Sequence, residues 1–176
     1  MSKFSVLTIS ISLLSVALPV VAQPQGGGVK PIVQSGCRQG QCWESQVLGT
    51  RLAQKTPRGQ LYQITVGRRS WAMDRQPPSQ FAERSQNYVY CSQTRPAYIF
   101  RNPAGGGYLA HLLNPGGEAF GYNQNAYPVY WGVCHGIYNQ DVFSPAMTQK
   151  AKQLGYSLNL TSDQIPLLRV VDILER

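Results

Sequence analysis

The side chains best suited to covalent chemistry in this 176-residue chain are four cysteines and two histidines. A cysteine hydrolase needs a thiolate beside an imidazole base. Cys91 and His111 make the better pair, because Cys91 lies in one predicted strand and His111 in another that can neighbour it. Cys134 and His135 are adjacent, and on a strand their side chains would point to opposite faces. A small exported hydrolase using Cys91 and His111 is therefore an alternative function, provided that Cys91 is a free thiol.

Carboxylates offer a second route to catalysis, since glycoside cleavage uses a pair of them. Glu118, in a loop after Gly116-Gly117, is the candidate acid, and nothing in the sequence places a partner for it. The chain has neither a Gly-x-Ser-x-Gly elbow nor a His-Glu-x-x-His helix. These residues favour a binding or structural role over catalysis.

The four cysteines predict two disulfides, because an even number in an exported chain pairs by oxidation. The spacing of Cys37 and Cys42 suits a local bridge, which leaves Cys91 and Cys134 to join each other. The alternative is that Cys37 and Cys42 each reach a distant strand, which would close two long loops. A zinc site needs closer Cys and His spacings, so we predict no metal and no cofactor.

Positive charge is concentrated in the first half of the chain. The formal net charge is +8, and between residues 30 and 101 eleven Lys and Arg face three acids. Such an excess fits a solvated basic face without a ligand as well as it fits a surface that attracts an anionic polymer, a glycan or another envelope protein. Nucleic acid is a poor candidate, because the basic residues are scattered along strands rather than gathered on a reading helix.

Aromatic and amide side chains suggest how a ligand surface would be built. Ten Tyr and three Trp occur, and the stretch from Tyr122 to Tyr127 combines rings with Asn and Gln. Rings stack on sugars, amides bond hydroxyls, and guanidinium groups pair with carboxylate or phosphate. The predicted ligand-binding residues are Arg51, Arg58, Arg68, Arg69, Arg95, Arg101, Tyr122 and Tyr127. An antiparallel sheet would allow them to share one face or rim.

The first 22 residues read as a secretory signal peptide. Lys3 supplies the positive end, an apolar run follows, and Ala22 provides a small residue for cleavage. The apolar run is shorter than the roughly 20 residues that cross a bilayer, so we predict no transmembrane segment after cleavage. Residues 23–36 are rich in Gly and Pro and predict a flexible leader. Residues 37–176 then form one domain in the periplasm or outside the cell.

The predicted fold class is mainly β, an antiparallel meander or small barrel stabilised by disulfides, with a short helical C-terminal extension. Short β-forming runs alternate with Gly- and Pro-rich turns, which is typical of such sheets. Strands are expected at 47–56, 61–66, 88–91, 97–100, 108–113 and 129–138, with surface loops at 73–87 and 120–127. Ser144-Pro145 predicts the start of a helix that closes at Gly155. The apolar tail 167–174 fits a helix or a buried strand, and we favour the helix.

Three short stretches resemble small exported proteins of cyanobacteria that have no assigned role. They are Tyr90-Cys91-Ser92, Arg95-Pro96-Ala97 and the run from Tyr130 to His135. The resemblance spans residues 37 to about 138 and implies a periplasmic bacterial protein. It brings no active site with it.

Overall fold

A seven-stranded antiparallel sheet dominates the computed structural model, which describes residues 31–138 and 141–175. The strands are β1 (Ile32–Arg38), β2 (Gln41–Thr56), β3 (Gly59–Ala72), β4 (Glu83–Cys91), β5 (Ala97–Arg101), β6 (Tyr108–Leu112) and β7 (Gln164–Leu167). Their order in the sheet is their order in the chain, so the predicted meander is confirmed. The proposed signal peptide and the leader up to residue 30 lie outside the described residues.

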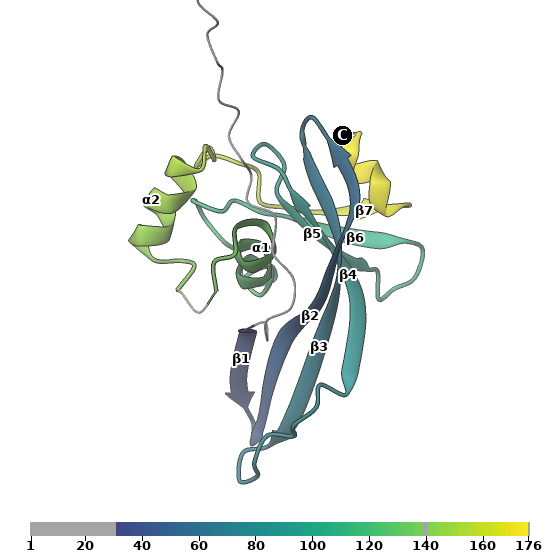
Figure 1. Cartoon of the computed structure of the whole chain (residues 1–176), viewed down its shortest axis with the longest axis vertical. Coiled ribbons are helices and arrows are strands. Elements are labelled where there is room, and N and C mark those ends of the chain that lie inside the picture. Colours follow the sequence, from purple (N-terminus) through teal and green to yellow (C-terminus); the bar gives the residue numbers. More distant parts are fainter. Residues whose placement is uncertain (1–30, 139–140, 176) are drawn as a thin grey trace, which may run out of the picture.

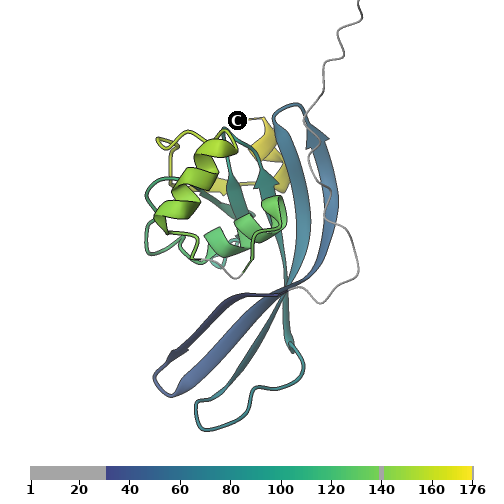
Figure 2. The same ribbon diagram turned by 60° about the vertical axis from the view of Figure 1, so that its left-hand side comes forward.

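One end of the sheet is a long extension formed by β1–β4, the arm (Figures 1 and 2). β2 and β3 have 16 and 14 residues and remain paired along their whole length. One end of β1–β4 extends well beyond the helices (Figures 1 and 2). A two-residue turn joins β1 to β2 at this end, where Gln39 and Gly40 both take positive φ, as tight hairpins require.

The two faces of the sheet are buried by different parts of the chain. Side chains alternate along each strand, so the register assigns every residue to one face. The helix face carries Tyr62, Val89 and Tyr98 and packs against helix α1 (Ala126–His135). The tail face carries Leu61 and Ile99, among others, and packs against the C-terminal segment.

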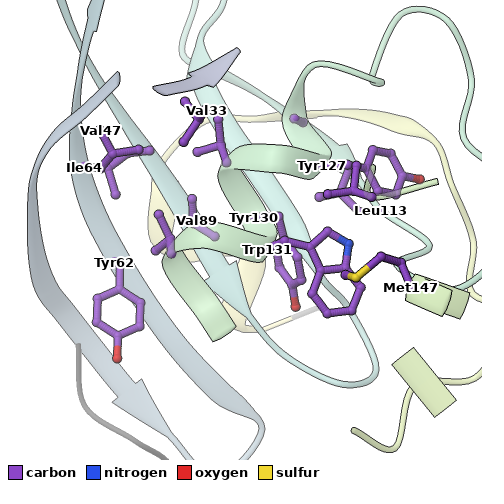
Figure 3. Close-up of a cluster of buried hydrophobic side chains, with 14 of the residues drawn as sticks. Val33, Val47, Tyr62, Ile64, Val89, Leu113, Tyr127, Tyr130, Trp131 and Met147 are labelled. Carbon is purple, nitrogen blue, oxygen red and sulfur yellow. The ribbon is translucent and has the colours of Figure 1, made fainter. Parts of the chain in front are cut away.

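Helix α1 replaces the strand predicted at residues 129–138, so that prediction is wrong. The segment contains many β-formers, and most of its residues are buried, including Tyr130 and Trp131. It lies between the sheet and residues 142–156, so both of its sides are apolar and no helical period is visible in the sequence. Gly136 ends the helix in the left-handed conformation, and Figure 3 shows α1 against Val89 and Met147.

Other boundaries also differ from the predictions. β1 begins at Ile32, so the last residues of the expected leader belong to the sheet, where β1 pairs with β2. The loop predicted at 73–87 ends early, because β4 begins at Glu83. Helix α2 (Pro145–Gln153) is confirmed. The helix favoured for the tail is confirmed over Val170–Leu174, which form a 3₁₀ helix, η1, that covers the tail face. The first tail residue, Leu167, ends strand β7 instead.

Two disulfides close the structure, with the pairing that local spacing favoured. Cys37 and Cys42 face each other across the β1–β2 turn. Cys91, at the end of β4, is bonded to Cys134 in α1, 43 residues away. The second bridge therefore ties the helix to the sheet that it covers.

We expect the two disulfides to contribute unequally to stability. In the chain-entropy account, removing the longer loop by Cys91→Ser with Cys134→Ser lowers the free energy of unfolding by about 4 kcal/mol, against about 2 kcal/mol for Cys37→Ser with Cys42→Ser. Urea denaturation of the two double variants measures the difference. Equal losses would contradict the chain-entropy account of these two bridges.

Candidate functional site

A pocket of about 620 Å³ lies on the helix face, beside the start of α1. The strand register places Asn87, Tyr98 and His111 on this face in three neighbouring strands. Gln34 of β1 closes another side, and its amide donates to the backbone carbonyl of Asn125 just before α1. The pocket therefore exists where α1 leaves part of the sheet uncovered.

Hydrogen bonds hold the polar groups of the pocket in place. The Asn87 amide donates to Tyr98 Oη at 2.7 Å and to Ser85 Oγ at 3.2 Å. Burial raises the pKa of Tyr98 to about 12, and the bond from Asn87 partly opposes that rise. Tyr98 is therefore a neutral phenol at physiological pH, and its hydroxyl hydrogen is not used by Asn87.

His111 is also neutral in this position. Its Nε2 lies 2.9 Å from Oε1 of Gln164 in β7. An amide oxygen only accepts, so Nε2 carries the proton and Nδ1 is left as an acceptor. Burial lowers the pKa of His111, and the bond to Gln164 opposes this in part.

Aromatic rings line the pocket around His111. Phe100 meets the imidazole edge to face at a centroid distance of 4.9 Å, and Tyr122 does so at 5.3 Å. Tyr122 is stacked on Phe120 and remains 51% exposed. The loop that carries it is held by buried Asn123, which donates to Ser162 Oγ at 2.8 Å. An exposed ring on a fixed loop is suited to contact a ligand.

Among the residues that the structure describes, Arg101 is the one Lys or Arg that lines this pocket. It ends β5, and its guanidinium carbon lies 4.7 Å from the centre of the Tyr108 ring. The remaining polar lining consists of neutral amide, hydroxyl and imidazole groups, which include Gln34, Ser85 and Asn87. Such a lining offers many donors and acceptors and little charge.

The disulfide Cys91–Cys134 contradicts the hydrolase alternative built on Cys91 and His111. No free cysteine occurs in the described residues, so Cys91 has no thiolate to offer. His111 bonds Gln164 instead. Glu118 is exposed, and its backbone carbonyl accepts from the Tyr127 hydroxyl at 3.3 Å.

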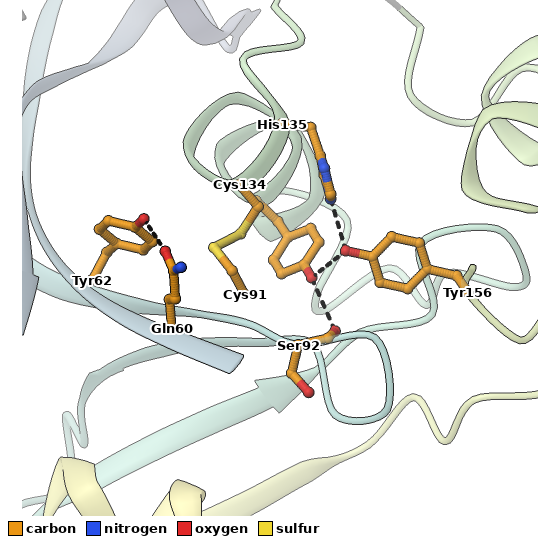
Figure 4. The surroundings of a disulfide bond; sticks show 8 residues. Gln60, Tyr62, Cys91, Ser92, Cys134, His135 and Tyr156 are labelled. Atoms are coloured by element: carbon orange, nitrogen blue, oxygen red, sulfur yellow. Dashed lines mark hydrogen bonds between the residues drawn. A yellow bond between two sulfur atoms is a disulfide. The ribbon is translucent and has the colours of Figure 1, made fainter. Parts of the chain in front are cut away.

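A chain of hydrogen bonds lies beside this disulfide (Figure 4). Tyr130 Oη lies 3.3 Å from the Ser92 carbonyl, Tyr156 Oη lies 2.8 Å from Tyr130 Oη, and His135 Nε2 lies 2.7 Å from Tyr156 Oη. The carbonyl can only accept, so Tyr130 donates to it, Tyr156 donates to Tyr130, and His135 donates to Tyr156. Each hydroxyl proton is used once, so Nε2 of His135 carries the proton that it donates. Burial lowers the pKa of His135 to about 4, so the ring is neutral at physiological pH.

The register separates the predicted arginines. Arg51 bonds Gln63 on the tail face, and Arg69 lies on that face in an ion pair with Glu44 at 2.6 Å. Arg68 lies on the helix face. The others are distributed between two turns and the end of a strand: Arg58 between β2 and β3, Arg95 between β4 and β5, and Arg101 at the end of β5.

Of the predicted ligand residues, Arg101 and Tyr122 are the two that line the pocket. Tyr127 does not offer its ring, because it is buried in α1, where its hydroxyl accepts from the backbone N–H of Asn114 at 3.1 Å. The sequence analysis did not select Gln34, Asn87, Tyr98 or Phe100. No local pattern singles them out, because they are spread over β1, β4 and β5 and meet only through the register.

Within residues 31–138 and 141–175, no helix has the length and apolar character needed to cross a membrane. In the same residues, no three His, Cys, Asp or Glu side chains gather as ligands for a metal ion.

No family model, no curated protein and no solved structure matches this chain. The function must therefore be argued from the site.

We expect acid to destabilise the protein through His135. Burial, and secondly the charge of Lys150, lower the pKa of this histidine from 6.5 to about 4. Its contribution to stability is present above pH 6.5 and is lost as the pH falls to about 4, because the unfolded chain then binds a proton that the folded chain refuses. The loss should be about 2 kcal/mol, given partial exposure.

Urea denaturation between pH 7 and pH 4 measures this loss. His135→Gln should flatten the pH dependence across that window, and Lys150→Gln should reduce it slightly. Parallel curves for the wild type and His135→Gln would contradict the assignment.

Proposed function

We propose that the protein is an exported binding protein of the cell envelope, and that the pocket on the helix face takes a glycan. The observation that carries this proposal is the lining: amides, hydroxyls and a neutral imidazole stand beside Phe100 and exposed Tyr122. Sugar hydroxyls need donors and acceptors, and their rings present C–H faces that aromatic side chains cover. A cavity of about 620 Å³ is large enough for a small ligand.

The compartment is part of the same proposal. Two disulfides in one small domain are typical of oxidising compartments, and residues 1–22 have the composition of a secretory signal. The resemblance to exported cyanobacterial proteins supports a bacterial periplasm.

We expect the exported protein to begin at Gln23, because Ala22 supplies the small residue that signal peptidase requires. N-terminal sequencing of the protein recovered from the periplasm of an expressing bacterium measures this. A chain that retains Met1 would contradict the signal-peptide proposal.

A glycan array with the purified protein tests the ligand class, followed by calorimetric titration of a glycan that binds. Tyr122→Ala should weaken binding about tenfold, because it removes one stacking ring. Phe143→Ala is the matched control, since Phe143 is 49% exposed and does not line this pocket. Its affinity should remain that of the wild type.

Two results would overturn the proposal. One is the absence of binding to every glycan of the array. The other is a Tyr122→Ala variant, folded by circular dichroism, that binds as tightly as the wild type.

A further inference from the structure

The helix face continues past the pocket along the arm. Ser85, which lines the pocket, is paired with Val66 in β3, and the next row along the face contains Glu83 and Arg68. Arg68 is paired in turn with Ser45, and Ser45 with Gln34, which also lines the pocket. Arg68 therefore lies in the same cross-strand row as Gln34 and one row beyond Ser85.

Arg68 is held by an aromatic ring on this surface. Its guanidinium carbon is 5.0 Å from the centre of the Trp43 ring. The same ring system lies close to Gly36, where an added Cβ would come within 3.2 Å of a ring carbon. Glycine at this position therefore lets the indole lie down against β1. An indole in this position supports the guanidinium without neutralising it.

No acidic side chain pairs with Arg68 among the residues that the structure describes. The ion pairs there are Arg69–Glu44 and Arg169–Asp172. Glu83 is opposite Arg68 in the register, and its carboxylate lies instead 3.5 Å from Ser70 Oγ. Arg68 is exposed, so its guanidinium is available to an external anion.

We propose that Arg68, supported by Trp43, is a second subsite that binds the carboxylate of an acidic sugar in a glycan whose neighbouring unit occupies the pocket. The inference rests on the proposed function, because the pocket supplies the first contact. Strands are about 4.8 Å apart, so Arg68 and Gln34, two strands apart, are separated by roughly 10 Å at the backbone. The ligand must therefore be an oligosaccharide rather than a single sugar.

Charge complementarity selects the acidic sugar. The planar guanidinium offers two parallel N–H donors to a carboxylate, which a hydroxyl cannot match. Glu83 opposes the same anion from the same row. The site should therefore respond in opposite directions to the removal of these two charges, a pattern that loss of folding cannot produce.

The experiment compares an oligogalacturonate with its methyl ester, which has the same sugars without the charge, by calorimetric titration at low and high salt. For the acid, Arg68→Gln should weaken binding about fivefold, and Glu83→Gln should tighten it about twofold. Arg68→Lys should fall between the wild type and Arg68→Gln. The matched control is Arg51→Gln, which removes an equal charge from the same hairpin on the opposite face.

The outcomes separate this inference from the proposed function. Tighter binding of the acid than of the ester, lost in Arg68→Gln and at high salt, supports the subsite. Equal binding of acid and ester, with sensitivity to Tyr122→Ala alone, overturns the subsite and leaves the pocket. An equal effect of Arg51→Gln and Arg68→Gln also overturns it, because the attraction is then to net charge. Failure of every glycan to bind overturns both.

Discussion

The packing of α1 on the sheet is the interaction on which the rest of the structure depends. A seven-stranded meander has two apolar faces, and an uncovered face would remain in water at a cost of about 25 cal/mol for each Å². α1 covers one face with Tyr130 and Trp131, while η1 covers the other. The Cys91–Cys134 bridge and the buried hydroxyl chain that ends at Ser92 hold α1 at one place on β4.

The pocket forms because α1 does not cover the whole helix face of the sheet. α1 has ten residues, and the helix face is wider than it can cover. At the start of the helix, the chain places a turn bearing Tyr122 over β5 and β6, and polar groups replace the apolar core there. Asn87, Tyr98 and His111 bond to neighbouring side chains, so the polar groups of the pocket are fixed in position.

The alternation of side chains along the strands determines which face of the sheet carries each arginine. Arg68 and Arg69 are neighbours in the chain, yet one stands on the helix face over Trp43 and the other pairs with Glu44 on the tail face. A count of charges therefore overstates the basic surface that any ligand meets. The glycan proposal rests on the lining of the pocket, and its acidic subsite rests on Arg68, rather than on the net charge.

Local patterns in the sequence determined the meander, its turns, helix α2 and the favoured cysteine pairing, because alternation, Gly and Pro positions and short spacings act within a few residues. α1 was not predictable in this way. Its residues favour strands, and burial on both sides removes the helical period that would have revealed it. The pocket was also decided by tertiary structure alone. Gln34, Asn87 and Tyr98 belong to separate strands, and only the register across the sheet and the position of α1 bring their side chains together.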